Sequence, residues 1–165
     1  MNETFTARVW ILDDDIDTDI IIPTEYLALK TVQDMTPYAF SPLRPELAGQ
    51  IKPGDIIVAG KNFGCGSSRE QAPEIIKALG VKAVVAKSFA RIFYRNSINN
   101  GLLLIENADL HEAVKEGDTV EITVGEKITA NGQEYEIASL PENLLEILNA
   151  GGLVKAMRKR NGLED

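Results

Sequence analysis

The sequence has very few of the residues that carry most metal and covalent chemistry. Its 165 residues include one cysteine, Cys65, and one histidine, His111. A disulfide framework, a zinc finger and an iron–sulfur cluster each need several such ligands, so this chain alone cannot build them. A histidine-dependent triad would have to use His111, and a cysteine–histidine dyad would need Cys65 beside it. These shortages exclude most self-contained catalytic centres.

Basic residues are also scarce. Lysine and arginine number 17 against 25 aspartates and glutamates, which gives a formal net charge of −8. Nucleic acids and anionic membranes need a basic footprint, so we expect neither as a partner. No apolar stretch approaches the ~20 residues that span a bilayer, and Met1–Trp10 lacks the apolar core of a signal peptide. We expect a cytoplasmic protein with Cys65 as a free thiol.

The remaining composition fits one folded domain. Apolar residues make up 44% and charged residues 25% of the sequence, and a chain of 165 residues can bury most of its surface. We therefore expect a single domain over residues 1–165. The segment Thr36–Pro53 holds four of the seven prolines and no periodic apolar face. It is typical of an ordered loop or a short irregular helix.

Strand and helix patterns alternate through the first two thirds of the chain. Thr6–Leu12 alternates apolar and polar residues, as a strand does. Three continuous apolar runs are typical of strands buried on both faces: Asp55–Ala59, Ala83–Ala86 and Leu102–Ile105. Apolar residues at helical spacing predict helices between these runs, over 72–79 and 90–99. This β-α-β-α-β order predicts an α/β fold with a mixed, partly parallel sheet and flanking helices.

The rest of the chain predicts an antiparallel meander and a helical tail. The strands expected here are Thr119–Val124, Lys127–Ala130 and Glu134–Ala138. Asn131-Gly132 is a strong hairpin signal between the last two. From Pro141 we expect a helix, a Gly-Gly break and a second helix, followed by a solvated basic run at Arg158–Arg160.

The segment Gly60–Arg69 (GKNFGCGSSR) carries the clearest sign of a ligand site. It follows a buried strand and precedes a helix, where α/β folds bind ligands. The glycine loop at its centre consists of Gly64, Cys65 and Gly66. Glycines allow close approach to the backbone, and free N–H groups at a helix start favour anions. Ser67, Ser68 and Arg69 add two hydroxyls and a guanidinium suited to a carboxylate or phosphate.

A structural explanation of the same serines is equally open. Ser67 and Glu70 fit the S-x-x-E capping box, which only stabilises a helix start. Pro73 argues against it, because proline would delete a backbone hydrogen bond if the helix began at Ser67. The alternative places the serines in a turn ahead of the helix, with Pro73 in the first helical turn.

The acidic segment Asp13–Leu29 (DDDIDTDIIIPTEYLAL) is a second candidate. Asp15, Asp17 and Asp19 are spaced two apart, so an extended strand would place them on one face. They could bind a hard cation, but the glycine and terminal glutamate of an EF-hand loop are missing. A hydrogen-bonding turn is the main alternative, and an active-site carboxylate is another.

Three further features have structural alternatives. Lys87–Arg91 is another strand-to-helix junction, which would either bind an anion or hold the glycine loop in place. Cys65 has no acid or base partner beside it in the sequence, which favours a passive thiol. His111 lies in a charged stretch and is expected on the surface of a helix.

Taken together and in this order, four segments resemble the small subunits of 3-isopropylmalate dehydratases and, more broadly, the swivelling domain of the aconitase superfamily. The matching segments are DDDIDTDIIIP, GKNFGCGSSREQAP, VKAVVAKSFARIFYRNSINNGLLLI and ILNAGGLV. The resemblance implies a swivelling β/β/α domain of the aconitase C-terminal type. It also implies a hydro-lyase that is active only with a large subunit, which carries the [4Fe–4S] cluster, while this chain holds no metal.

The resemblance also implies roles for particular residues. Ser67 would be the catalytic base, and Ser68 and Arg69 would bind a carboxylate of a small dicarboxylate substrate. Thr18 and Asp19 match a Thr-Asp pair that aconitases place at the active site. Ile22 stands where aconitases have a substrate-contacting serine, which argues against a tricarboxylate substrate.

Substrate specificity is implied for the loop formed by Tyr26, Leu27, Ala28 and Leu29. Homoaconitase-type relatives have an arginine at the position of Ala28, where it holds an extra carboxylate. An apolar loop suits a branched alkyl group and would leave a buried carboxylate unpaired. This favours isomerisation of 2- and 3-isopropylmalate in leucine biosynthesis. Citramalate/citraconate, dimethylmalate, homoaconitate and a non-catalytic anion-binding module stay open as alternatives.

Overall fold

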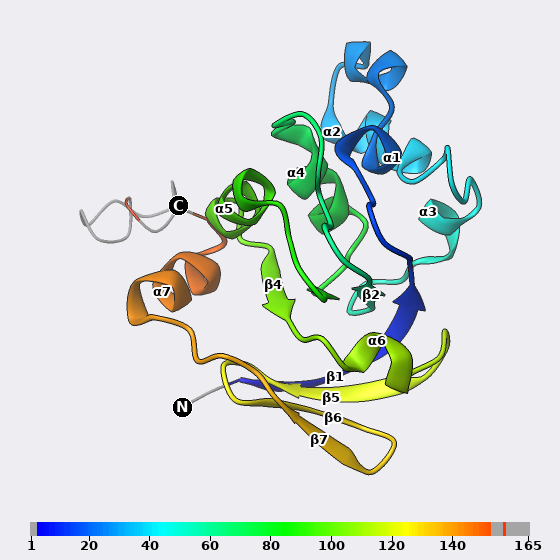
Figure 1. The fold of residues 1–165 in the computed structure, drawn as a ribbon. Helices are drawn as coiled ribbons and strands as arrows, with labels where there is room; N and C mark the ends of the chain where they lie inside the picture. Colours follow the sequence, from blue (N-terminus) through cyan, green and yellow to red (C-terminus); the bar gives the residue numbers. More distant parts are fainter. Residues whose placement is uncertain (1–2, 153–156, 158–165) are drawn as a thin grey trace.

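The computed structural model describes residues 3–152 and Met157, and a seven-stranded mixed sheet organises them (Figure 1). The strands are β1 Thr4–Ile11, β2 Ile56–Ala59, β3 Ala83–Ala86, β4 Leu103–Glu106, β5 Thr119–Thr123, β6 Lys127–Ala130 and β7 Gln133–Glu136. Their order across the sheet is β4-β3-β2-β1-β5-β6-β7. β1 joins the two halves, since it pairs in parallel with β2 and antiparallel with β5.

Both halves of the sheet follow the sequence prediction. β2, β3 and β4 pair in parallel, and β5, β6 and β7 form the antiparallel meander. Asn131 and Gly132 form the predicted hairpin turn, with φ of 51° and 79° respectively. Positive φ at both central residues is what a two-residue type I′ hairpin requires.

Helices lie on both sides of the sheet (Figure 1). The helical elements are α1 Thr18–Ile21, η1 Thr24–Ala28, α2 Val32–Met35, η2 Thr36–Tyr38, α3 Leu47–Gln50, α4 Gln71–Ala78, α5 Arg91–Asn99, α6 Leu110–Ala113 and α7 Glu142–Ala150. Of these, α1 to α5 pack on one core, and α6 and α7 pack on the core at the other face. The short η2 and α3 confirm the ordered, irregular segment expected at 36–53. None of the helices in the described ranges is long and apolar enough to cross a bilayer.

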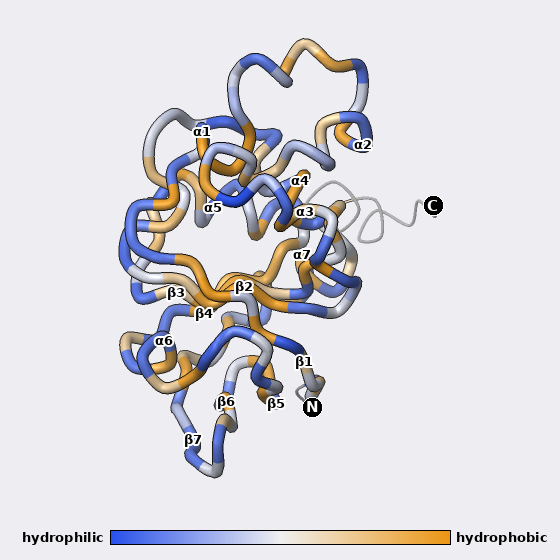
Figure 2. The backbone as a smooth tube through the Cα atoms, turned by 90° about the vertical axis from the view of Figure 1, so that its right-hand side faces the viewer, coloured by the Kyte–Doolittle hydropathy of each residue, from blue (hydrophilic) through white to orange (hydrophobic). Residues whose placement is uncertain are grey.

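Alternate residues of the parallel strands supply two hydrophobic cores. Ile57 of β2 packs in the core formed with α4 and the segments before it. Ile56 and Val58 face the other core, which includes α6 and the meander. The apolar strands therefore lie between two covered layers, which explains their continuous hydrophobic runs (Figure 2).

The C-terminal tail agrees with the prediction as far as the structure describes it. α7 ends at Ala150; its C-cap, Gly151, has a φ of 92°, and Gly152 follows with a φ of 139°. The predicted second helix and the basic run Arg158–Arg160 lie outside the described residues.

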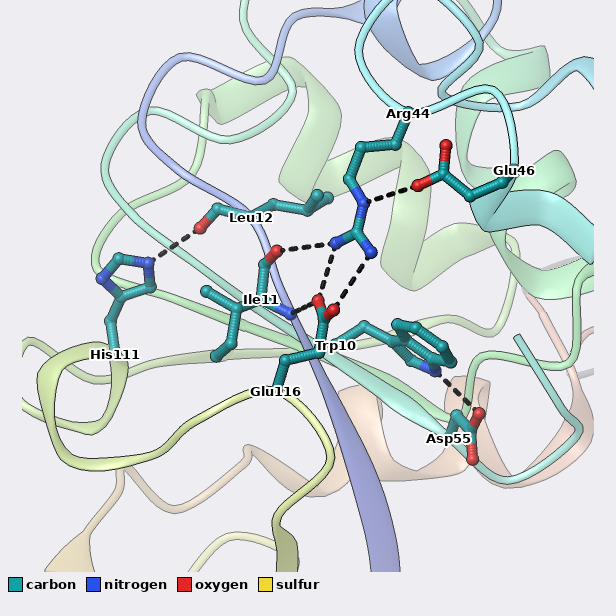
Figure 3. Close-up of polar contacts among 8 residues, drawn as sticks. All are labelled: Trp10, Ile11, Leu12, Arg44, Glu46, Asp55, His111 and Glu116. Atoms are coloured by element: carbon teal, nitrogen blue, oxygen red, sulfur yellow. Dashed lines mark hydrogen bonds and ion pairs between the residues drawn. The ribbon is translucent and has the colours of Figure 1, made fainter. Parts of the chain in front are cut away.

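Polar contacts hold the point at which β1 leaves the sheet (Figure 3). Arg44 forms a two-pronged ion pair with Glu116, at 2.6 and 3.0 Å. The Ile11 amide donates to the same Glu116 carboxylate at 3.1 Å. The Glu116 pKa is lowered mainly by the hydrogen bond from Arg44. These contacts tie the loop at 40–46 and the turn at 116 to the end of β1.

His111 differs from the surface residue expected from the sequence. It does lie on a helix, α6, but its side chain is only 18% exposed. Its Nε2 lies 2.8 Å from the carbonyl oxygen of Leu12, so this nitrogen donates the hydrogen bond (Figure 3). His111 therefore ties α6 to the chain just beyond β1, a long-range contact with no local sequence signal.

Asp55 is the acceptor on which the start of β2 depends. It is 6% exposed and accepts hydrogen bonds from Trp10 Nε1, Arg8 and the Lys52 amide at 2.8 to 2.9 Å. Burial raises the pKa of Asp55, but the hydrogen bonds from Trp10, Lys52 and Arg8 outweigh it and hold the pKa below its usual value.

We predict that Asp55→Ala lowers the free energy of unfolding by about 3 kcal/mol, since the buried Trp10 Nε1 and the part-buried Lys52 amide and Arg8 guanidinium lose their acceptor. Chemical denaturation at pH 7 measures this, with the exposed Asp109→Ala as the control. Because the folded pKa of Asp55 is lowered, its contribution is complete above the unfolded pKa and is lost as the pH falls through the folded pKa. The free energies of unfolding of wild type and Asp55→Ala, plotted against pH, should therefore approach each other in acid. A difference that stays constant with pH would contradict the prediction.

Candidate active site at the glycine–serine loop

The acidic segment and the glycine loop lie side by side. Four backbone hydrogen bonds of 2.7 to 3.2 Å join them: Gly60 N–H to Asp13 O, Asp15 N–H to Lys61 O, Gly64 N–H to Ile16 O and Thr18 N–H to Cys65 O. They extend the parallel pairing of β1 with β2 beyond the carboxyl ends of both strands. Two motifs that are far apart in the sequence thus form one unit at the edge where α/β folds bind ligands.

Side chains strengthen this pairing. Asp14 Oδ1 accepts from the Lys61 amide at 2.7 Å, and Asn62 Nδ2 donates to Asp15 at 3.1 Å. Thr18, which is 2% exposed, donates its hydroxyl hydrogen to the carbonyl oxygen of Ser67 at 3.0 Å. Thr18 therefore positions the backbone of the predicted catalytic serine.

The three aspartates do not share one face of an extended strand. Asp15 has a left-handed φ of 57°, while Asp17 caps α1 by accepting from the Ile20 amide at 2.9 Å. Asp19 follows inside α1. The hydrogen-bonding turn is the alternative that the structure supports. Among the described residues, no group of three His, Cys, Asp or Glu side chains is placed to hold a metal ion.

The segment Lys87–Arg91 holds the glycine loop from its other side. Ser88 accepts through its carbonyl from the Phe63 amide at 3.0 Å and through Oγ from the Asn62 amide at 2.8 Å. The Ala90 amide in turn donates to Phe63 O at 3.0 Å. Ser88 and Ala90 thus give the segment Lys87–Arg91 the supporting role that the sequence predicted.

Ser67 and Ser68 lie in an exposed turn ahead of α4. The capping-box explanation of Ser67 is wrong, because α4 begins at Gln71 and its N-cap, Glu70, receives no side-chain cap bond. Pro73 lies in the first turn of α4, where the lost amide hydrogen bond costs nothing. Among the described residues no hydrogen bond engages either serine hydroxyl, so both are available to a ligand.

Arg69 is held in place by the acidic segment. Its Nη1 donates to Asp19 Oδ1 at 2.7 Å and to the carbonyl oxygen of Ile22 at 2.9 Å, and its Nη2 donates to Thr24 Oγ1 at 3.3 Å. The hydrogen bonds from Arg69 and Thr24 lower the Asp19 pKa. The Arg69 side chain is 12% exposed. A guanidinium has five N–H donors, so it can still bind a carboxylate while Asp19 fixes its orientation.

A groove of about 210 Å³ lies in front of these residues. It is lined by Thr18, by Gly64 and Gly66–Arg69 of the loop, and by Ala90–Phe93 and Asn96 of α5 and the residue before it. Sequence reasoning missed Ile92 and Asn96. The predicted topology could have indicated them. The carboxyl ends of the adjacent parallel strands β2 and β3 meet at one edge of the sheet, so the segments that follow these strands become neighbours. A larger cavity of about 340 Å³ lies between α5 and β4, with mostly apolar walls and neither serine, so we place the chemistry in the smaller groove.

The predicted specificity loop does not line this groove. Tyr26 stacks on Tyr38 with ring centroids 4.1 Å apart and ring planes 6° from parallel. Leu27 is half-buried, whereas Ala28 and Leu29 are exposed. The structure therefore brings Thr18, Asp19, Ser67, Ser68 and Arg69 together, and leaves Tyr26–Leu29 outside the groove.

Cys65 lies half-buried within the glycine loop. Burial, followed by the negative charges of Asp17 and Asp15, raises the pKa of its thiol. A raised pKa keeps the thiol protonated and unreactive near neutral pH. The structure thus supports the passive role expected for this cysteine.

The fold and the glycine–serine–arginine loop define a domain of the aconitase C-terminal class, and the family model described as the aconitase C-terminal domain matches residues 23–110. The 3-isopropylmalate dehydratase small subunit of Lachnospira eligens is 80% identical over 164 residues, which cover 99% of this chain and 100% of the relative. The isopropylmalate/citramalate isomerase small subunit of Methanocaldococcus jannaschii is 45% identical over 163 residues, with 97% of each covered.

The crystal structure of a 3-isopropylmalate dehydratase from Methanocaldococcus jannaschii has the same fold. It matches with a TM-score of 0.90 and 42% identity, and the match covers 96% of each chain. The chain belongs to the family of 3-isopropylmalate dehydratase small subunits. The resemblance found in the sequence is confirmed.

Gly64 offers a direct test of how the loop is held. A Cβ at Gly64 would lie 2.1 Å from Phe93 Cγ, whereas a Cβ at Gly66 would meet nothing closer than 3.4 Å. Both residues have a left-handed φ, of 83° and 94°. We predict that Gly64→Ala lowers the free energy of unfolding by about 3 kcal/mol and Gly66→Ala by about 1 kcal/mol. Equal losses in chemical denaturation would show that the contact with α5 does not fix the loop.

Proposed function

We propose that this chain is the small subunit of a cytoplasmic 3-isopropylmalate dehydratase, a hydro-lyase that works with a large subunit in leucine biosynthesis. It interconverts 2-isopropylmalate and 3-isopropylmalate by dehydration and rehydration. The 80% identity over nearly the whole chain to a 3-isopropylmalate dehydratase small subunit carries this proposal. The free hydroxyl of Ser67 above an oriented arginine supplies a site of suitable chemistry.

The [4Fe–4S] cluster implied by the family belongs to the large subunit. A cluster of this kind is held by several thiolates, and these 165 residues include one cysteine. When bound in the partner, the cluster supplies a Lewis acid for the hydroxyl and a carboxylate of the substrate. The part left to this chain is proton transfer and recognition of the substrate.

Ser67 is the proposed catalytic base. Its Oγ, as alkoxide, takes the proton from the substrate carbon while the hydroxyl leaves the neighbouring carbon, and it returns the proton when water adds back in the other orientation. A serine is a poor base in water, so the oxyanion needs positive surroundings. Arg69 and the backbone amides at the start of α5 provide these on two sides of the groove. A partner that covers the exposed groove removes water, which strengthens the interaction of the oxyanion with Arg69 and with these amides.

Arg69 and Ser68 are the proposed ligands of a substrate carboxylate. Asp19, Thr24 and the Ile22 carbonyl fix the guanidinium from behind, so its remaining donors are oriented before the substrate arrives. Asp19 and Thr18 thus act as positioning residues, Asp19 on Arg69 and Thr18 on the backbone of Ser67.

The proposed substrate carries an alkyl group that contacts the apolar loop Tyr26–Leu29 when the large subunit closes over the groove. The four residues of this loop carry no charge, and the charged residues that flank it, Glu25 and Lys30, are exposed and of opposite sign, so an additional carboxylate would find no cation within the loop. Citramalate is a second candidate, because a relative 45% identical to this chain is named an isopropylmalate/citramalate isomerase small subunit.

We predict that Ser67→Ala lowers kcat of the anaerobically assembled enzyme about 1,000-fold, because the general base is lost. The fold presented to the large subunit should be unchanged, since no hydrogen bond joins the Ser67 hydroxyl to another described residue. Isopropylmalate isomerisation measures kcat, and analytical ultracentrifugation measures assembly with the large subunit. Ser68→Ala is the matched control, for which we expect mainly a higher KM. Turnover by Ser67→Ala at the wild-type rate would exclude Ser67 as the base.

We predict a substrate order in which kcat/KM for homoaconitate is at least about 100-fold below that for isopropylmalate, since its extra carboxylate would be buried without a partner. Parallel assays of isopropylmalate, citraconate and homoaconitate on one preparation test this order. Preference for homoaconitate would overturn the argument from the loop, while preference for citraconate would favour the second candidate.

A further inference from the structure

One exposed face of α5 has the composition of a protein interface. Arg91 and Arg95 are one helical turn apart, so they lie on the same side of the helix, and Ile92 lies beside them. Ile92 is 57% exposed, the highest value among the large hydrophobic side chains of the described residues. We call these three residues the α5 patch. Arginine and large apolar side chains are enriched where proteins bind each other.

Both arginines of the α5 patch lack a partner among the described residues. The other arginines in the described part of this acidic chain each pair with a carboxylate: Arg8 with Asp55, Arg44 with Glu116 and Arg69 with Asp19. By contrast, no ion pair or hydrogen bond joins the side chain of Arg91 or Arg95 to any residue in the described part of the chain. The α5 patch is therefore a local positive surface on an acidic protein.

The α5 patch is continuous with the catalytic groove. Arg91 and Ile92 belong to the wall of the groove that also holds Ser67 and Ser68. A large subunit that covers the groove must therefore cover the beginning of α5. Arg95 lies one turn farther along the helix and does not line the groove, so a small substrate would not account for it.

We propose that the α5 patch is a docking surface for the large subunit, which presents acidic side chains to Arg91 and Arg95 and an apolar pocket to Ile92. This proposal rests on the proposed function, from which it takes the identity of the partner. Charge complementarity of this kind orients the two subunits and speeds their association, while Ile92, once covered by the large subunit, slows their dissociation.

The experiment measures the Kd of the complex with the cognate large subunit, reconstituted anaerobically, for Arg95→Glu and Ile92→Asp. Each should raise Kd about 10-fold or more. The control, Lys115→Glu, makes the same charge change at an exposed position after α6 and should alter Kd less than about 2-fold. Wild-type Kd should also rise with salt, and Arg95→Glu should show a shallower salt dependence.

Turnover distinguishes docking from a direct effect on the substrate. Under the proposal, Arg95→Glu reaches wild-type kcat and KM once the large subunit is saturating. An unchanged Kd with raised KM for the substrate would overturn the proposal and assign the α5 patch to substrate binding. An unchanged Kd with unchanged kinetics would overturn it as well. If wild type assembles and the variants weaken assembly, but isopropylmalate is not turned over, the docking surface stands and the proposed function fails.

Discussion

The site depends on the backbone hydrogen bonds between residues 13–18 and 60–67. This short ladder continues the pairing of β1 and β2 past the point where their side chains enter the cores. Ile16 and Phe63 anchor the two segments in the core that also contains α4. The exposed residues between these anchors are held by main-chain hydrogen bonds and by the side-chain bonds of Asp14 and Asn62. Every residue with a proposed role in proton transfer or carboxylate binding is attached to this ladder.

The ladder explains how a loop of small residues can be ordered. Thr18 fixes the backbone at Ser67, and Asp19 fixes the guanidinium at Arg69. On its other side the loop bonds to Ser88, and Gly64 allows Phe93 to pack directly against the backbone. The acidic residues of the first motif thus contribute through orientation. Their number, which suggested a cation site in the sequence, is explained by helix capping at Asp17 and by the contacts with Arg69.

Much of the fold was predictable because its signals are local. Continuous apolar runs identified β2, β3 and β4, and Asn131-Gly132 identified the hairpin between β6 and β7. The conflict between Pro73 and a helix start at Ser67 was also local, and the structure resolves it in favour of the turn. Each of these predictions needed only the chemistry of a few neighbouring residues.

Features that depend on long-range contacts were not predictable from the sequence pattern. The partial burial of His111 accompanies a hydrogen bond to Leu12, and the left-handed φ of Asp15 accompanies its pairing with Lys61. The role of Ile92 and Asn96 as walls of the groove likewise requires the relative placement of β2 and β3. In each case the decisive partner is far away in the sequence, so a local pattern carries no information about it.

The groove is too small and too open to be a complete active site, which fits the shortage of catalytic residues in this chain. Its volume of about 210 Å³ is below the ~300–1,000 Å³ typical of complete ligand pockets. The serine hydroxyls are exposed, and the Tyr26–Leu29 loop does not reach them. An alkoxide at Ser67 would be quenched by water in such an open groove. A second surface is therefore a chemical requirement for the proposed base, and one chain that supplies a serine, an oriented arginine and an apolar loop needs no metal ligands of its own.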